Sequence, residues 1–450
     1  MNNKYQNIID AVNTAAKECG LSDFEIYLSK GESLSCETFR DEISEFSSSN
    51  TSTLFFRCIK DGKLGYATTQ SMNEADIIEL VKNAAENAEV IEKTERAIIY
   101  DGKGEYTPVE RRDFTFPSAA KLSEVAMDCR NVLYGEDEDV ADGTACGASA
   151  YFGSSMIYNS KGLFLENSGG NCGAFMYVVV SDKNGGAPEF AFKANHNDLD
   201  GFDKKAMAEY VVNKAKKKFG AGNVKTGKYN IVFHGDCMAQ ILSTYACSFY
   251  AERAQKGFSK ISKKNVGEML ASPAVTIIDT PFYPDNPMKM SYDGEGYPTK
   301  EKYVIKDGQF MTMLYNLTSA EKDGVESTGN ASRGGSSIGT RVFSFYIKPG
   351  EIDDKELFKK TGDGIYITSM KGFHAGANVI SGDFSIESEG FVIENGELTR
   401  PVRSFTVAGN FFELLKSIDT VSSEIDMKSP GYTQIASPAV LVPGMSVAGE

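Results

Sequence analysis

The 450-residue chain contains no tryptophan and only three histidines, so few imidazoles are available to hold a metal. It also lacks any run of about 18 apolar residues, the length that a membrane-spanning helix needs. The segment Met1–Gln6 has no basic stretch followed by an apolar core, so it does not resemble a secretory signal. We therefore expect no membrane span, and a cytoplasmic protein.

The eight cysteines include no CxxC pair, which is typical of small core residues scattered through a protein of a reducing compartment. Basic residues are too few to balance the acidic ones, and the net charge is −15. Nonspecific binding of nucleic acid relies on Lys and Arg displacing counterions from phosphates. We therefore expect no nucleic-acid partner.

What the sequence does contain is the pattern of a globular α+β protein of two or three domains. Residues 1–92 predict a helix, several strands and a second helix. Residues 93–116 are charged and suit a connector, and residues 117–220 then repeat the element order of the first segment. This shared order suggests two related units, with flanking helices packed on one antiparallel sheet. Residues 226–450 predict short strands with Gly, Asn and Asp turns, hence a mostly antiparallel, barrel-like β domain with inserted helices.

Local patterns give sharper predictions for single elements. Ser71 and Glu74 have the spacing of a capping box at the start of a helix. A long helix is expected from about Cys237 to Gln255, with Asp236 as its N-cap. Glu252 and Arg253 interrupt its apolar face, so its last turn is expected to be exposed.

The densest pattern lies in residues 376–410. Asn395-Gly396, between β-prone residues, is the strongest short-range signal for a hairpin, because a type I′ turn needs positive φ at both central positions. Upstream, Gly382-Asp383-Phe384-Ser385 predicts a turn. Downstream, Pro401–Asn410 predicts another strand and the start of a helix.

This stretch resembles the TldD/PmbA family, the "modulator of DNA gyrase" proteins, some of which are metallopeptidases. The shared motifs are Gly-x-Asn at 376–378, Gly-Asp-Phe-Ser at 382–385, Gly-Phe-x-Ile-Glu-Asn-Gly-Glu-Leu at 390–398, Pro-Val at 401–402 and Ala-Gly-Asn at 408–410. Further matches fall at 293–296, at 328–333 and at 443–449. The resemblance covers most of residues 226–450 and is looser before them.

In TldD-type members, the resemblance implies a HExxxH motif on the first helix of the C-terminal domain, with a late Cys as a further ligand. Two His would bind zinc and the Glu would act as general base. Here Leu242, Ser243 and Cys247 occupy the motif positions, and no Cys follows Cys247. The chain therefore resembles the PmbA/TldE-type branch, which lacks the motif. We expect no catalytic residue and no metal ligand in this chain, and zinc in a TldD-type partner.

Other chemical groups offer weaker alternatives. His234, Asp236 and Cys237 form a conceivable metal cluster, although capping of the following helix explains them more simply. Asp293 and Glu295 form a carboxylate pair in a Gly-rich turn, where acids are more often solvated or turn-capping. An independent hydrolase using Asp293 and Glu295, or using Cys237, remains an open reading.

Candidate substrate-binding residues come from two loops. In the first, Gly329 allows a close approach of backbone, while Asn330 and Arg333 suit peptide carbonyls or a carboxylate; a purely structural loop is the equal alternative. In the second, a His beside a Gly-rich turn suits a cleft. The complete set is Thr328, Gly329, Asn330, Arg333, His374, Asn378 and Asp383.

The resemblance, together with the missing ligands, implies a non-catalytic subunit of a TldD/PmbA metallopeptidase complex that processes or matures small peptides. Its partners would be a zinc-bearing TldD-type subunit, forming a heterodimer, and a peptide substrate, with a homodimer open for the isolated chain. The alternative is a regulatory or scaffold binding protein without a proteolytic role.

Overall fold

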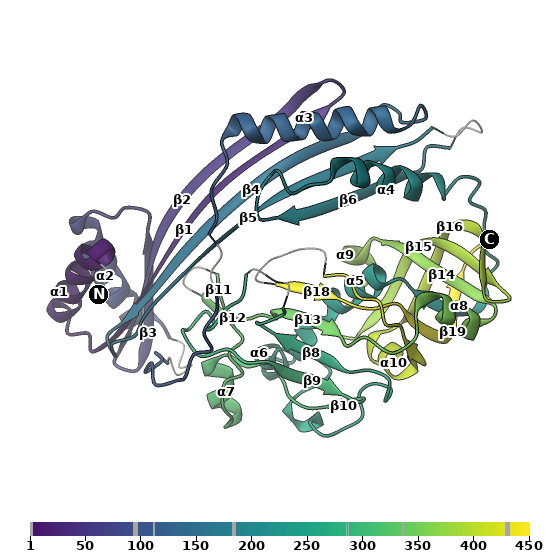
Figure 1. Ribbon diagram of the computed structural model, residues 1–450. Helices are drawn as coiled ribbons and strands as arrows, with labels where there is room; N and C mark the ends of the chain where they lie inside the picture. The colour runs from purple at the N-terminus through teal and green to yellow at the C-terminus, as the bar shows by residue number, and fades with distance from the viewer. Residues whose placement is uncertain are drawn as a thin grey trace.

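The computed structural model describes residues 3–92, 98–110, 113–181, 186–284, 286, 288–334, 337–427 and 433–450. Figure 1 shows two parts, a long curved sheet that carries helices on its outer side and a C-terminal domain beneath it. Within the predicted connector, residues 93–97 and 111–112 lie outside the described residues. No helix in the described ranges combines the length and the apolar character needed to cross a membrane.

The N-terminal half is built on one six-stranded antiparallel sheet with the order β3-β2-β1-β4-β5-β6. Its strands are β1 (Asp23–Phe39), β2 (Glu42–Lys60), β3 (Lys63–Thr69), β4 (Ala145–Asn159), β5 (Phe164–Val179) and β6 (Glu189–His196). The first unit contributes β1 to β3 and the second contributes β4 to β6. The central β1–β4 pair joins them, so the predicted single antiparallel sheet is confirmed.

Four helices cover one face of this sheet, and we call that face the outer face. They are α1 (Gln6–Glu18), α2 (Glu74–Val90), α3 (Ala119–Glu136) and α4 (Lys204–Lys216), with a short 3-10 turn at Asn3–Tyr5. Because side chains alternate along a strand, even-numbered residues of β1 point to this face. Ile26 and Leu28 pack under α1 and α2, while Cys36 packs under α3.

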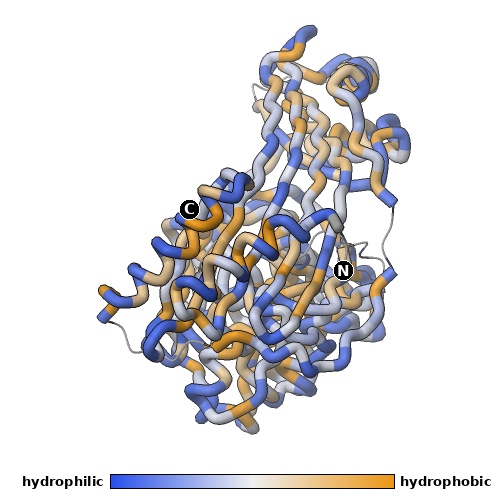
Figure 2. The backbone as a smooth tube through the Cα atoms, turned by 90° about the vertical axis from the view of Figure 1, so that its left-hand side faces the viewer, coloured by the Kyte–Doolittle hydropathy of each residue, from blue (hydrophilic) through white to orange (hydrophobic). Residues whose placement is uncertain are grey.

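The opposite, inner face is covered by no helix described in the N-terminal half. Serine and glycine make up most of its surface along the central strands. On β1 and β4 it presents Ser29, Gly31, Ser33, Ser35, Ser149, Tyr151, Gly153 and Ser155. Figure 2 shows the sheet rising from the C-terminal domain, with hydrophilic and hydrophobic residues interleaved along its strands. This interleaving is the pattern of a sheet with one packed face and one polar face.

The C-terminal domain contains a closed five-strand barrel, as predicted. The order β16-β15-β14-β7-β19 closes on itself through a β16–β19 pairing, and all its pairings except β7–β14 are antiparallel. The strands are β7 (Gly227–Phe233), β14 (Gly364–Lys371), β15 (Asp383–Glu394), β16 (Glu397–Asn410) and β19 (Val440–Ala448), with β17 (Thr420–Val421) added beside β19.

A second sheet, a small hairpin and several short helices complete this domain. The sheet has the order β10-β9-β8-β13-β18, with strands Gln309–Phe310, Lys302–Lys306, Ile277–Thr280, Ser344–Ile347 and Gln434–Ala436. The hairpin pairs β11 (Ala331–Gly334) with β12 (Ser337–Thr340). The helices are α5 (Gly235–Tyr245), α6 (Ala251–Gln255), α7 (Leu317–Asp323), α8 (Asp354–Thr361), α9 (Phe373–Gly376) and α10 (Phe411–Ser417), and the 3-10 turns are η2 (Ala246–Phe249) and η3 (Lys263–Asn265).

Three local predictions are wrong. The N-cap of α2 is Asn73 rather than Ser71, and its side chain accepts a hydrogen bond from the Asp76 backbone N–H. The long helix breaks after Tyr245, because Tyr250 adopts an extended conformation and bridges to Leu314. The last turn is half-buried rather than exposed, since the Glu252 carboxylate accepts a hydrogen bond from the Thr340 backbone.

Candidate functional site

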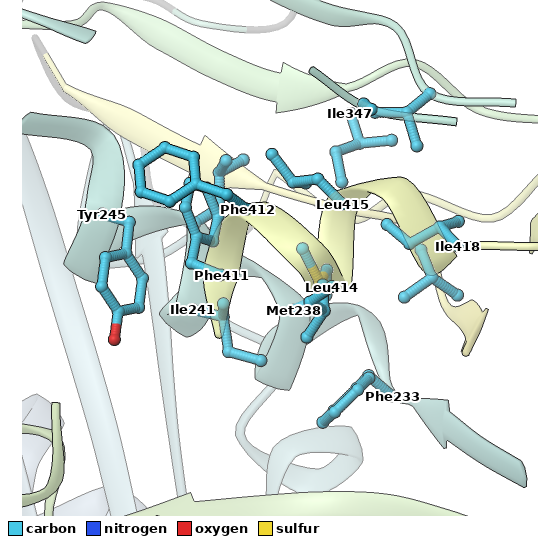
Figure 3. Close-up of a cluster of buried hydrophobic side chains, with 14 of the residues drawn as sticks. Phe233, Met238, Ile241, Tyr245, Ile347, Phe411, Phe412, Leu414, Leu415 and Ile418 are labelled. Carbon is cyan, nitrogen blue, oxygen red and sulfur yellow. The ribbon is translucent and has the colours of Figure 1, made fainter. Parts of the chain in front are cut away.

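Helix α5 packs its apolar face against α10 in the largest core of the chain. Met238, Ile241 and Tyr245 of α5 lie against Phe411 and Leu414 of α10 (Figure 3). The rings of Tyr245 and Phe411 stack with centroids 4.7 Å apart. These contacts fix which way every side chain of α5 points.

The positions that correspond to HExxxH therefore have defined environments. Leu242 is fully buried in the core, Ser243 is exposed, and Cys247 lies half-buried in η2 beyond the end of α5. Burial raises the pKa of the Cys247 thiol, which disfavours the thiolate that metals bind. An aliphatic side chain at one position and a disfavoured thiolate at another do not fit a zinc ion.

The same helix positions the Gly-Asp-Phe-Ser motif. The predicted turn is wrong, because Asp383, Phe384 and Ser385 form the start of strand β15 and pair with β16. The Tyr245 hydroxyl donates a hydrogen bond of 2.8 Å to the backbone carbonyl of Asp383. The Asp383 carboxylate accepts hydrogen bonds from the Asn410 amide at 2.8 Å and from the Ser381 hydroxyl at 2.7 Å. These two hydrogen bonds lower the pKa of Asp383, so the exposed carboxylate is ionised at neutral pH.

A shallow groove of about 530 Å³ runs along the start of β15. Asn378, Ile380 and Asp383 line it, and α9, which carries the exposed His374, forms one end. Three of the predicted substrate-binding residues, His374, Asn378 and Asp383, thus lie on one exposed surface next to the end of α5. The groove offers an apolar floor at Phe384 and a fixed negative charge at Asp383.

The other four predicted residues lie elsewhere, in a buried polar network. Asn330 is fully buried. Its amide donates to the Asp279 carboxylate at 2.7 Å, and its side-chain oxygen accepts from the ammonium of Lys302 at 2.9 Å. Thr328 donates to the same oxygen, and Gly329 has φ +69° with the Pro298 carbonyl where a Cβ would stand. Burial lowers the pKa of Lys302, although Asp279 opposes this effect.

Arg333 extends this network to the N-terminal sheet. Its guanidinium contacts the Glu25 carboxylate of β1 at 2.5 Å and donates to the Gly294 carbonyl at 3.1 Å. Arg57 of β2 donates to the same Glu25 carboxylate at 2.9 Å. Burial alone would raise the pKa of Glu25, but the charges of Arg333 and Arg57 outweigh it and lower that pKa. Glu25, Arg57 and Arg333 therefore form a buried ionic junction between the two halves.

Asp293 and Glu295 belong to this junction and are not solvated, so that part of the prediction is wrong. Both side chains are 1% exposed. The expected capping role is confirmed, because Asp293 accepts hydrogen bonds from the backbone N–H groups of Glu295, Tyr297 and Ala331. Burial, together with the charge of Glu295, raises the pKa of Asp293 to about 8. Burial likewise raises the pKa of Glu295, against the charge of Arg57.

His234 is itself the N-cap of α5, so the prediction that Asp236 takes this role is wrong. The His234 Nδ1 accepts a hydrogen bond from the Asp236 backbone N–H at 3.1 Å. Cys237 points away into the hydrophobic core and is 1% exposed. In the described residues, no group of three His, Cys, Asp or Glu side chains is arranged to hold a metal ion.

Sequence reasoning did not single out Glu25, Arg57, Asp279 or Lys302, which hold the two polar networks together. Glu25 lies between Phe24 and Ile26 on an apolar strand, so alternation places it on the face opposite the helices. A charged residue on that face is usually solvated, so the local pattern did not indicate its burial. Its partner Arg333 lies 308 positions away in the sequence.

Comparison with known proteins identifies the architecture. The models of the PmbA/TldA metallopeptidase family match three segments: domain 1 at residues 24–88, the central domain at 112–219 and the C-terminal domain at 226–449. The metalloprotease PmbA of Escherichia coli O157:H7 is 23% identical over 449 residues, covering 98% of this chain and 96% of that protein.

Two crystal structures share the whole fold. A candidate modulator of a DNA gyrase from Thermotoga maritima superposes with a TM-score of 0.89 at 26% identity, covering 99% of this chain and 100% of that one. TldE from Thermococcus kodakarensis superposes with a TM-score of 0.88 at 22% identity, covering 98% and 100%. The chain therefore belongs to the PmbA/TldD metallopeptidase family.

Proposed function

We propose that this chain is the non-catalytic, PmbA/TldE-type subunit of a cytoplasmic TldD/PmbA metallopeptidase. In this proposal it forms a heterodimer with a TldD-type subunit that carries the HExxxH motif and the zinc ion. The complex cleaves or matures small peptides. This chain contributes substrate contacts and a structural frame, while the partner supplies the metal-activated water.

The observation that carries the proposal is the chemistry of α5. The core packing of this helix directs Leu242 inward and leaves Ser243, a poor general base, at the surface. A catalytic zinc site needs three protein ligands and an open position for water. The resemblance assigns the motif to this helix, and its side chains do not supply that set.

The exposed groove supports a role in substrate binding. His374, Asn378 and Asp383 are accessible, and the ionised Asp383 suits a peptide amino terminus or a basic side chain. Thr328, Gly329, Asn330 and Arg333 form their contacts within the chain. We therefore propose that these four residues act by holding the junction between the two halves in place.

The test is a peptidase assay combined with metal analysis. The purified chain is assayed alone and together with a TldD-type companion from the same genome, and zinc is quantified in each sample. We expect no zinc and no cleavage with the chain alone, and cleavage with the pair. A pair in which the companion's HExxxH glutamate is replaced by glutamine is the control and should be inactive.

Two results would contradict the proposal. Stoichiometric zinc on the isolated chain, with peptide cleavage that a chelator abolishes, would show that the chain has its own catalytic site. Copurification with an unrelated protein, together with unchanged activity of the TldD-type companion when this chain is added, would favour a regulatory or scaffold protein.

A further inference from the structure

The buried junction between the two halves contains more carboxyl groups than guanidinium groups. Its members are Glu25 and Arg57 of the N-terminal sheet, and Asp293, Glu295 and Arg333 of the C-terminal domain. None of these side chains is more than 5% exposed. Two positive charges balance only two ionised carboxylates, and the interior of a protein strongly disfavours a third, unpaired one. The closed junction is therefore electrically neutral when one of its carboxyl groups holds a proton.

That proton belongs to Asp293 and Glu295, which we call the carboxyl pair. Burial acts to raise the pKa of Glu25, but contact with Arg333 and Arg57 outweighs this effect and lowers that pKa. Glu25 is therefore ionised. Burial raises the pKa of Asp293, and the charge of Glu295 raises it further. Burial also raises the pKa of Glu295, against the charge of Arg57. The two acids lie on one turn, so they share the proton and titrate together.

The other ionisable groups around the carboxyl pair do not balance its charge. Lys302 forms an ion pair of its own with Asp279, at 3.1 Å between ammonium and carboxylate. The hydroxyl groups of Tyr100, Tyr106 and Tyr297 also face Asp293, and burial raises the pKa of each one. These tyrosines are therefore neutral at the pH values at which the pair titrates.

The closed junction also leaves buried polar atoms without hydrogen bonds, which favours opening. Arg57 and Arg333 both contact Oε1 of Glu25, and Oε2 of this carboxylate has no hydrogen-bond partner among the described residues. Nη2 of Arg57 and Nε of Arg333 are buried in the same unsatisfied state. Water would bond to all three atoms if the two halves parted here. The closed and open forms therefore differ less in free energy than a fully hydrogen-bonded interface would require.

We propose that this junction is a proton-operated latch between the N-terminal sheet and the C-terminal domain. With one proton on the carboxyl pair, the buried charges balance and the latch is closed. Loss of that proton leaves one excess negative charge, and parting of the two halves at this point exposes the charge to water. Ion pairs elsewhere between the halves, such as Lys371–Glu189, keep the molecule together. This inference does not depend on the proposed function.

Proton linkage gives the direction of the pH effect. A hydrated Asp carboxyl in the open form releases its proton at the ordinary pKa of 3.8, whereas the closed form keeps it until about pH 8. The ratio of closed to open molecules therefore falls as pH rises between these two values, by at most about tenfold per pH unit. The ratio is constant above them.

The test uses the absence of tryptophan from the chain, because a single introduced tryptophan then reports only on its own surroundings. The Tyr106 hydroxyl donates to the Gly296 carbonyl across the junction at 2.8 Å. Tyr106→Trp keeps an aromatic ring and an N–H donor at this position. Fluorescence quenching by acrylamide, which is uncharged, measures how far water reaches the ring. We expect the quenching constant to rise at least about twofold between about pH 5 and pH 8.5. Circular dichroism over the same range shows whether the chain stays folded.

Two substitutions separate the latch from a general effect of pH. Asp293→Asn and Glu295→Gln each leave two carboxylates to balance two guanidinium groups. Combined with Tyr106→Trp, each should keep the quenching constant low over the whole pH range. Either variant suffices if the other does not fold.

Phe391→Trp is the matched control, because Phe391 lines a cavity that also contacts Lys371 and Glu189. Hydrogen bonding between these two residues raises the pKa of Lys371, and hydrogen bonds from Tyr177 and Lys371 lower the pKa of Glu189. Quenching at this position should not change with pH. A constant quenching value for Tyr106→Trp would overturn the proposal. So would an equal rise in both charge variants, or an equal rise for Phe391→Trp.

Discussion

At the scale of single residues, the carboxylates of this chain behave in opposite ways according to their access to water. Asp383 is exposed, and hydrogen bonds from Asn410 and Ser381 lower its pKa. Asp293 is 1% exposed, and burial raises its pKa to about 8. Asp383 is thus a negative charge that a ligand can contact. Burial favours the protonated form of Asp293, which supports the junction between the two halves.

Asp293 gives a pH dependence with a defined sign. Between the unfolded value of 3.8 and about 8, the folded state retains a proton that the unfolded state has released. The free energy of unfolding therefore falls as pH rises through this window, by at most about 1.4 kcal/mol per pH unit. Asp293→Asn cannot titrate and lacks this slope. Urea unfolding should show that the stability of the wild type relative to the variant decreases from about pH 5 to pH 8.

Asp383→Asn is the control for this measurement. Because the folded pKa of Asp383 is lowered, its contribution to stability is present above the unfolded pKa and is lost only as pH falls below it. The relative stability of this variant should stay flat between about pH 5 and pH 8. A flat profile for Asp293→Asn as well would mean that Asp293 is ionised in the folded protein.

His374 tests the groove in the assembled peptidase. It is exposed, and loss of one hydrogen bond to substrate costs about 0.5–1.5 kcal/mol. His374→Ala should raise the KM of the complex for a peptide about two- to tenfold while leaving its zinc content unchanged. His196→Ala removes another exposed imidazole, from the N-terminal half, and should leave KM unchanged. If both substitutions raised KM by the same factor, His374 would have no specific role in substrate binding.

At the scale of elements, the β15–β16 hairpin shows how a two-residue turn can also serve as a packing contact. Asn395 and Gly396 have φ of 51° and 80°, as the type I′ prediction requires, and Glu394 pairs with Glu397 across the turn. A Cβ on Gly396 would stand 2.8 Å from the Cα of Lys359 in α8. Gly396 therefore serves two purposes. It adopts the positive φ of the turn, and it leaves room for the close contact with α8.

Gly396→Ala should consequently destabilise the protein by more than about 1 kcal/mol, through backbone strain and the contact with α8. Gly135→Ala, in the last turn of α3, meets open space and a helical backbone, and should stabilise the protein by about 0.5–1 kcal/mol. Chemical denaturation of both variants gives the comparison. A neutral Gly396→Ala would show that the hairpin can shift away from α8.

Elements that depend on neighbouring residues could be predicted from the sequence. Features that depend on contacts between residues far apart in the sequence could not. The Asn-Gly hairpin and the helix that starts after Asn410 follow from local residues, and both are present. The break after Tyr245 could not be predicted, because it depends on the bridge between Tyr250 and Leu314. The burial of Asp293 and Glu295 was missed for the same reason, since Arg57 of the N-terminal sheet faces them.

At the scale of the whole molecule, two groups of polar contacts among the described residues join the N-terminal half to the C-terminal domain. One joint is the buried junction of Glu25, Arg57 and Arg333, beside which the Tyr106 hydroxyl donates to the Gly296 carbonyl at 2.8 Å. The other joint is more exposed and consists of the ion pairs Lys218–Glu389 and Lys371–Glu189. The sheet spans the distance between them (Figure 1).

The two joints should respond differently to salt. Arg333→Ala leaves the Glu25 carboxylate buried with one partner fewer, which costs about 3–5 kcal/mol. Lys371 is about half exposed, so Lys371→Ala should cost less than about 1 kcal/mol. Raising the salt concentration screens exposed charges and should remove the smaller effect while leaving the larger one. Thermal unfolding of both variants at low and high salt makes the comparison, and a salt-sensitive Arg333→Ala would show that water enters the junction.

The presence of two joints also limits how the molecule can move. A lid needs one fastened side and one free side, so that rotation about a few bonds carries the free side outward. This sheet is held on both sides of its span, so lifting either side has to break the contacts of that joint. An extended peptide that threads in from the side could reach the inner face while both joints stay closed.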